Sequence, residues 1–282
     1  MELRRREFII NKSENSPNEC KDCYAIAPDK SRIAVSDGAA QSIFTGEWAE
    51  ILTFGFVESS PGIKFIKPGD KVVRDQAVKE WLFEQWLPAL QAKWRERVAG
   101  IPVPYFAEER FRRGAYATFL GLEFKETRSG RFLRWQATAV GDSMLFIVRK
   151  DVLSLWFPFQ LKDTGDFPRH PALLCSRILG NDHIKNGEGL NGVLIAGGKC
   201  SPGDVFILGT DALAKWFLTR NKAGDRPWEK LCAITSQEEF AKFVEERRAE
   251  DQIEDDDTTL VIVDVTQNSP ILPGATGAGH GD

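Results

Sequence analysis

Aspartates placed at the ends of predicted strands are the residues of this sequence best suited to chemistry. Five separate strand ends carry at least one such residue: Asp22, Asp37, Asp142, Asp211 and the run 255–257. A single Asp-Gly pair such as Asp37-Gly38 is typical of a simple turn. Five aspartates at the ends of otherwise apolar segments are hard to explain as turns, because a buried carboxylate needs a partner.

Carboxylates in this number favour a site for hard divalent cations. Mg²⁺ and Mn²⁺ take oxygen ligands, and the three histidines His170, His183 and His280 are far apart in the sequence. Two such ions about 4 Å apart would clamp a phosphate and generate a hydroxide nucleophile.

The elements that must position these aspartates follow from the hydrophobic pattern. Short apolar segments joined by tight turns predict antiparallel strands. Predicted strands cover 7–12, 22–27, 32–36, 115–123, 132–140, 144–149, 191–196, 204–209 and 258–265. Predicted helices cover 47–57, 70–86 with Asp70 as N-cap, 89–98 after a break or kink at Pro88, 212–218 and 236–249. Two runs of strands separated by a helical block indicate two antiparallel sheets flanked by helices.

Composition excludes several other classes of protein. The 282 residues carry a net charge of −4, which argues against a nucleic-acid-binding domain. Basic clusters at 4–6 and 110–113 are interpreted as solvated surface. No apolar run approaches the roughly 20 residues of a membrane span, and no secretory signal is visible, so we expect a cytoplasmic protein.

Three other motifs are weaker candidates. Cys20 and Cys23 lack the second pair that a zinc site would need. The G-x-G-x-x-G match at 187–192 precedes a strand, which is the wrong context for a dinucleotide fingerprint. In the acidic run at 250–257 we retain Asp256 as a ligand and interpret Glu250, Asp251 and Glu254 as surface.

Five sequence blocks contain the strand-end aspartates. These are Asn18–Ile26 (N-x-D-A), Ala34–Gly38 (A-x-x-D-G), Ala139–Ser143 (A-x-x-G-D-S), Leu208–Leu213 (T-D-G-L) and Asp256–Val261 (D-[DN]-x-T). In the order and spacing of these blocks the chain resembles the metal-dependent type 2C protein serine/threonine phosphatases over roughly residues 7–265.

The resemblance implies a fold and a set of ligands. The fold would be a four-layer α/β/β/α sandwich over residues 1–266, and we expect residues 267–282 to be a disordered tail. Asp37, Asp211 and Asp256 would bind one Mn²⁺ or Mg²⁺ ion. Asp37 would bridge to a second ion, which also takes the Gly38 carbonyl and is supported by Asp22. Asp142 and Asp211 would form a weaker third site.

The same resemblance implies the activity. A water bridging the two ions, and therefore dependent on Asp37 and Asp211, would attack the phosphorus of phosphoserine or phosphothreonine without a phosphoenzyme. The partners would be a phosphorylated protein and a cognate kinase, with no nucleic acid and no membrane. We expect a monomer.

This sequence departs from the family in the residues expected near the substrate. The sequence has Ala39, Ala40, Gln41 and Ala212 at positions where the family has other residues. No arginine precedes Asp22 at the usual place for phosphate binding. Lys12 and Lys21 are the candidate replacements. A catalytically weak binding module and a phosphatase for small molecules therefore remain as alternatives.

Overall fold

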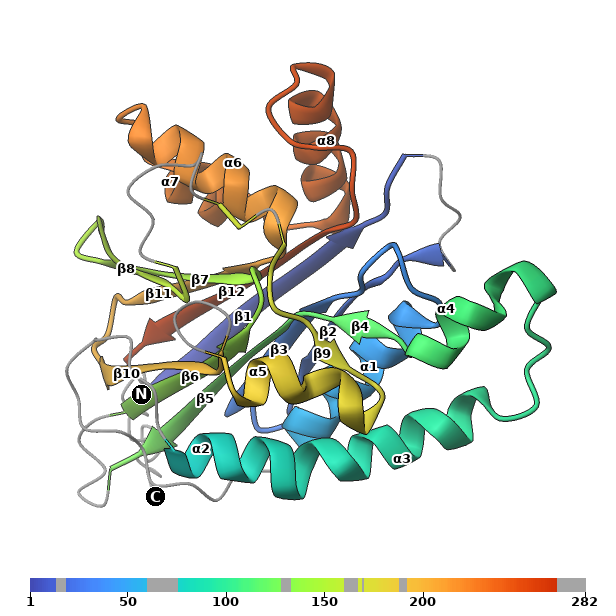
Figure 1. The fold of residues 1–282 in the computed structure, drawn as a ribbon. Helices are drawn as coiled ribbons and strands as arrows, with labels where there is room; N and C mark the ends of the chain where they lie inside the picture. The colour runs from blue at the N-terminus through green and yellow to red at the C-terminus, as the bar shows by residue number, and fades with distance from the viewer. Residues whose placement is uncertain are drawn as a thin grey trace, which may run out of the picture.

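Two antiparallel sheets packed face to face form the centre of the molecule (Figure 1). The structure is a computed structural model, and it describes residues 1–13, 19–59, 76–127, 133–159, 167–168, 170–187 and 192–267. In strand order, the first sheet contains β1 (Glu2–Ile10), β12 (Thr258–Thr266), β11 (Val205–Gly209), β7 (Met144–Arg149) and β8 (Val152–Phe157). The second contains β10 (Leu194–Cys200), β6 (Leu133–Val140), β5 (Phe119–Glu126), β3 (Arg32–Asp37) and β2 (Asp22–Ile26).

Helices cover the outer face of each sheet (Figure 1). On the first sheet lie α6 (Asp211–Lys222), α7 (Pro227–Ala233) and α8 (Gln237–Ala249). On the second lie α1 (Thr45–Glu58), α2 (Gln76–Glu80) and α3 (Leu87–Val98). Shorter elements complete the chain: α4 (Glu108–Arg113), β4 (Tyr116–Ala117), β9 (Leu174–Cys175) and α5 (Asp182–Lys185). The expected four-layer sandwich is confirmed.

Side-chain alternation along the strands separates the core into three layers. In β3, Ile33 and Val35 pack between the two sheets, whereas Ala34 between them packs toward α1. In β12, Val261 and Val263 face the second sheet, whereas Leu260 and Ile262 face α6 and α8. The same alternation, continued to the strand ends, decides which polar side chains point between the sheets.

The long helical region differs from the prediction around Pro88. Instead of a break, a π-helical turn at Trp81–Trp86 joins α2 to α3, and Pro88 lies in the first turn of α3. The backbone stays helical at Trp86 and Leu87, so the helix continues through the proline, and the wider π-helical turn before it accommodates a residue that has no N–H to donate. The predicted N-cap Asp70 lies outside the described residues.

Several boundaries also differ. β1 begins at Glu2, so the basic cluster at 4–6 is part of a strand, and Arg6 donates to the carbonyls of Cys232 and Ile234. The interpretation of that cluster as solvated surface was wrong for Arg6. No strand or helix was predicted between 150 and 187, and the structure has β8, β9 and α5 there. Residues 188–191 of the glycine-rich match and the tail from 268 lie outside the described residues. Among the residues described, no helix is long and apolar enough to cross a membrane.

Candidate active site

Strand alternation brings the strand-end polar residues together at one end of the sandwich. Asp22 lies two residues before Tyr24, which packs between the sheets, and in the β2–β3 register it is opposite Asp37. Thr210 and Thr259 occupy the equivalent inward positions at the ends of β11 and β12, two residues from Leu208 and Val261. The two sheets therefore contribute facing side chains to one site.

Asp22 is held in place by hydroxyl groups from the opposite sheet. Its Oδ2 accepts hydrogen bonds from Thr210 Oγ1 and Thr259 Oγ1, both at 2.8 Å. The residue is only 5% exposed, and its Oδ1 has no hydrogen-bond partner. A buried carboxylate oxygen without a partner is costly, so this atom is the clearest sign that the site is shaped for a cation.

Asp37 and Asp142 are joined through Thr118. The Asp37 N–H donates to Thr118 Oγ1 at 2.9 Å, and the Thr118 N–H donates to the Asp37 carbonyl at 2.8 Å. Thr118 Oγ1 also lies 2.8 Å from the hydroxyl of Ser143, next to Asp142. Gly141 before it has φ of 100°, a conformation that favours glycine. The Gly-Asp-Ser corner is thereby fixed beside the end of β3.

The charges of the other four predicted aspartates all act on Asp37. Burial raises the pKa of Asp37 well above its ordinary value, and the charges of Asp22, Asp211, Asp142 and Asp256 raise it further. Burial and Asp211 raise the pKa of Asp142 to about 7, against the opposing effect of Lys215. Like charges gathered in this way repel one another unless cations neutralise them.

Asp256 and Asp257, in the acidic run before β12, have different surroundings. Asp256 is exposed, and partial desolvation and the charge of Asp211 raise the pKa of its carboxyl group. Asp257 is buried, and its two carboxylate oxygens accept the backbone N–H groups of Lys12 and Lys21 at 2.8 and 2.7 Å. Asp257 therefore secures the segments that lead into and out of the loop before β2, a role that the sequence did not reveal.

A cavity of about 860 Å³ opens onto these carboxylates. Asp37, Asp142 and Asp211 line it together with three cationic side chains: Arg110, Arg113 and Lys215. The candidate phosphate-binding residues Lys12 and Lys21 do not line this cavity and border other hollows instead. The cluster at 110–113 is exposed, as predicted. Its position at the cavity was not predicted from the sequence, because it depends on where α4 lies in the folded chain.

The donor set fits a hard divalent cation. All five side chains offer carboxylate oxygens, the Asp22 Oδ1 lacks a partner, and the charges are mutually repulsive. Within the described residues, no three acidic, histidine or cysteine side chains are arranged closely enough to form a ready coordination cluster. Several carboxylates bind protein donors instead, as Asp211 binds Lys215 and Asp22 binds two threonines.

Comparison with solved structures finds the same fold in proteins whose sequences differ widely from this one. The structure matches the Mycobacterium tuberculosis serine/threonine phosphatase PstP/Ppp with a TM-score of 0.56 and 15% identity, covering 94% of this chain and 99% of that chain. It matches the serine/threonine phosphatase Stp1 from Staphylococcus aureus with a TM-score of 0.58 and 10% identity, covering 95% and 96% of the two chains.

A further match is the catalytic domain of PstP in complex with two manganese ions, with a TM-score of 0.53, 14% identity and coverage of 94% and 99%. No protein-family model and no curated protein matches the sequence. At these identities the comparisons establish the fold, and they confirm the resemblance noted from the sequence at that level.

Proposed function

We propose that this protein is a metal-dependent phosphatase that hydrolyses phosphoserine and phosphothreonine in protein substrates. The observation that carries the proposal is the position of Asp37 among four further aspartates, at one end of a sandwich shared with serine/threonine phosphatases. Carboxylates in that arrangement suit hard cations, and the adjoining cavity supplies cationic groups for a phosphate.

The carboxylates have separate roles in this proposal. Asp37, Asp211 and Asp256 would hold one Mn²⁺ or Mg²⁺ ion, and Asp37 with the Gly38 carbonyl would hold a second, supported by Asp22. When bound, the two ions would polarise the phosphate and lower the pKa of the attacking water. The two manganese ions in the PstP catalytic domain support a site for two ions in this fold.

The rest of the site would orient these groups and bind the substrate. Thr210 and Thr259 fix Asp22 Oδ2, which leaves Oδ1 for a cation. Arg110 and Arg113 border the cavity and would bind the phosphate oxygens, since a guanidinium presents several N–H groups to such a ligand. No side chain of this protein would become phosphorylated. A cognate serine/threonine kinase, a cytoplasmic location and a monomeric state stay predictions from the sequence.

Hydrolysis of phosphopeptides in the presence and absence of Mn²⁺ tests the proposal. The wild-type protein should release phosphate from phosphoserine and phosphothreonine peptides when Mn²⁺ is added, and EDTA should stop the reaction. Asp37→Asn should abolish turnover. Asp182→Asn, an exposed aspartate at the start of α5, should retain it and serves as the matched control.

Two other results would point elsewhere. No release from any phosphopeptide at saturating Mn²⁺ would refute the proposal and favour a binding module that keeps the phosphatase fold. Faster release from phosphorylated metabolites than from phosphopeptides would favour a small-molecule phosphatase.

A further inference from the structure

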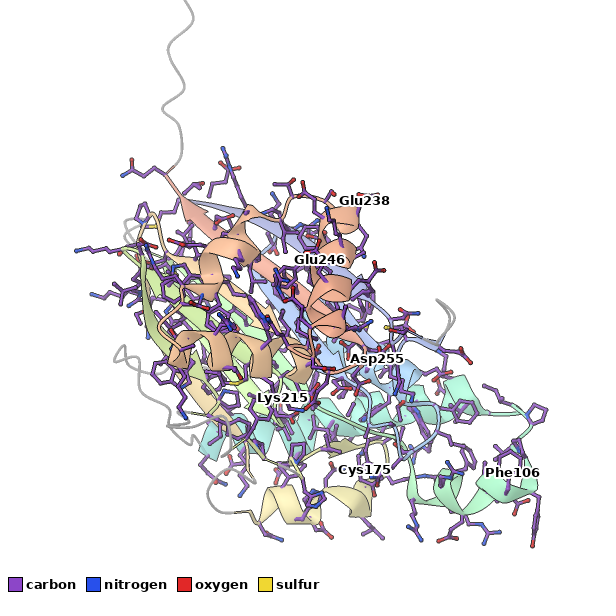
Figure 2. All side chains as sticks on the ribbon, turned by 90° about the horizontal axis from the view of Figure 1, so that it is seen from above. Phe106, Cys175, Lys215, Glu238, Glu246 and Asp255 are labelled. Carbon is purple, nitrogen blue, oxygen red and sulfur yellow. The ribbon has the colours of Figure 1, made fainter. Side chains whose placement is uncertain are left out.

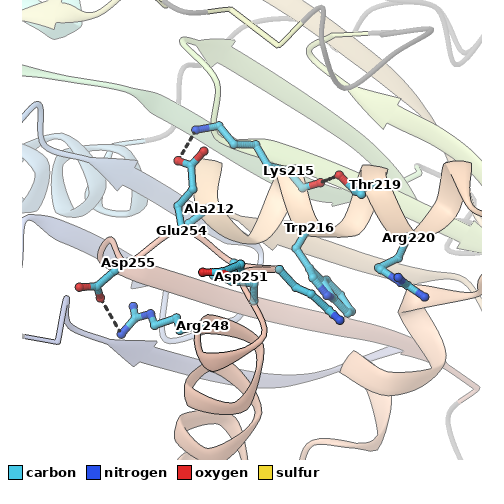
Figure 3. Close-up of a pocket in the computed structure, with 11 residues that line it drawn as sticks. Ala212, Lys215, Trp216, Thr219, Arg220, Arg248, Asp251, Glu254 and Asp255 are labelled. Carbon is cyan, nitrogen blue, oxygen red and sulfur yellow. Dashed lines mark hydrogen bonds and ion pairs between the residues drawn. The ribbon is translucent and has the colours of Figure 1, made fainter.

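A lysine ammonium is built into the cluster of carboxylates. Lys215 lies one turn after Asp211 on α6, and its Nζ is 2.8 Å from Asp211 Oδ2. The same Nζ is 2.8 Å from Glu254 Oε2, on the loop between α8 and β12 (Figure 3). It also lies 5.4 Å from the centre of the Phe167 ring, within the range of a cation–π contact. Three groups from separate segments therefore fix this ammonium.

The position of Lys215 connects it to the proposed metal site. Its side chain borders both the 860 Å³ cavity that contains Asp37 and Asp142 and a neighbouring cavity of about 490 Å³. Lys215 and Asp255, both labelled in Figure 2, border the smaller cavity. The positive charge of Lys215 acts on Asp142 in addition to Asp211. Lys215 thus lines the same cavity as the pair of aspartates that the sequence resemblance assigned to a third ion.

We propose that the Lys215 ammonium serves as a permanent cation for the Asp142–Asp211 side of the site, in place of a third divalent ion. This inference rests on the proposed metal-dependent function and limits it to two ions. One oxygen of Asp211 is occupied by Lys215, and the other remains for the core ion. An internal cation neutralises the carboxylates at every metal concentration, which a weakly held ion does not.

A role for Lys215 in binding the substrate phosphate is less consistent with its contacts. The Nζ of Lys215 lies 2.8 Å from a carboxylate oxygen of Asp211 and 2.8 Å from one of Glu254. Its charge is thereby already balanced by two carboxylates. Arg110, in contrast, lines the same cavity and has no hydrogen-bond or ion-pair partner among the residues that the structure describes. Arg110 is the better candidate for the phosphate.

Counting bound Mn²⁺ tests this inference directly. Equilibrium dialysis against Mn²⁺ alone, followed by metal analysis, should give two ions per wild-type chain. Lys215→Met keeps a long unbranched side chain but exposes the carboxylates of Asp211, Glu254 and Asp142 to a new ion, so it should bind three. Lys215→Arg keeps the charge and should bind two. Lys242→Met, which removes an exposed lysine paired with Glu246 on α8, is the matched control and should bind two.

A double variant locates the added ion. Lys215→Met combined with Asp142→Asn should return the count to two, with far-ultraviolet circular dichroism confirming that each variant is folded. The inference is overturned if the wild-type chain binds three ions, if Lys215→Met still binds two, or if the third ion persists in the double variant. A wild-type chain that binds no Mn²⁺ would refute the proposed metal-dependent function as well, so the two failures are distinguishable.

Discussion

Replacing Asp22 by asparagine should stabilise the metal-free protein while weakening its response to metal. Asparagine has the same shape, and its carbonyl oxygen can accept the two threonine hydrogen bonds that Oδ2 accepts now. Its amide nitrogen would then take the place of the unpartnered Oδ1. The negative charges of Asp257 and Asp211 act on this position, so they favour a neutral amide over a carboxylate there.

The size of the effect follows from that unpartnered oxygen. Leaving a buried polar group unsatisfied costs about 1–3 kcal/mol. A gain of about 2 kcal/mol corresponds to an increase in Tm of about 4–8 °C for a domain somewhat smaller than this one. At saturating metal the wild-type protein should be more stable than the variant. One ion at 100 times its Kd adds about 2.7 kcal/mol to the free energy of unfolding, and the variant should bind that ion less tightly.

Asp257 provides a matched control for the same substitution. It is as buried as Asp22, but both of its oxygens accept backbone N–H groups. Asp257→Asn would place an amide N–H against one of these donors. We expect a loss of about 1.5–3 kcal/mol, the value of a hydrogen bond to a charged group. Replacing aspartate by asparagine should therefore raise the stability of the metal-free protein at position 22 and lower it at position 257.

The difference between wild type and Asp22→Asn should depend on pH. Burial, together with Asp257 and Asp211, raises the pKa of folded Asp22 despite the threonine hydrogen bonds. A raised folded-state pKa means that stability is greatest below the unfolded pKa of about 3.9 and is lost as pH rises. The advantage of the variant should thus be small near pH 4 and grow toward pH 8.

Thermal unfolding followed by circular dichroism, in EDTA and in Mn²⁺, measures these quantities. If Asp22→Asn loses as much stability in EDTA as Asp257→Asn, the reasoning from the unpartnered oxygen is wrong. An advantage that shrinks as the pH rises would contradict the assignment of the cost to the buried charge.

Three further changes test other parts of the site. Arg110→Ala should raise the KM for a phosphopeptide about tenfold or more, since a hydrogen bond to a charged group contributes about 1.5–3 kcal/mol; Arg112→Ala, which removes an exposed pair with Glu108, should leave KM unchanged. Gly38→Ala should lower the free energy of unfolding by about 1–3 kcal/mol, measured in urea, because its Cβ would lie 2.8 Å from Thr45 Cβ. Ser236→Ala should lower the free energy of unfolding by about 1 kcal/mol, since Ser236 caps α8 by accepting the Glu239 N–H. The number of bound Mn²⁺ ions should stay the same, and a change in that number would show that the effect extends beyond the helix.

The parts of the site that were predictable from sequence are those fixed by local pattern. Asp22 and Asp37 could be placed because each adjoins a short apolar strand and a tight turn joins the two strands. The alternation of those strands then determines which way each carboxylate points. The N-cap of α8 could be narrowed to Thr235 or Ser236 for the same reason, and the structure shows that it is Ser236, whose hydrogen bond spans only three residues.

The remaining parts depend on contacts between distant segments. Asp211 and Lys215 have the spacing of a helical ion pair, but nothing in the sequence places Glu254 beside them. Glu254 was interpreted as a surface residue, and its side chain is indeed 65% exposed. It nevertheless forms an ion pair with Lys215 beside the site. Arg110 reaches the cavity because of how α4 folds back, and Asp257 binds two backbone N–H groups more than 230 residues earlier.

The position of β12 determines when this site can exist during synthesis. β12 lies between β1 and β11, and it pairs with β1 along nine residues (Figure 1). Thr259 on this strand binds Asp22, and Asp257 just before it secures the loop ahead of β2. A nascent chain that has not yet released residue 266 from the ribosome therefore has a gap in the first sheet and no assembled cluster of carboxylates. The chemistry proposed for this site can therefore begin only after β12 has been synthesised and has paired with β1.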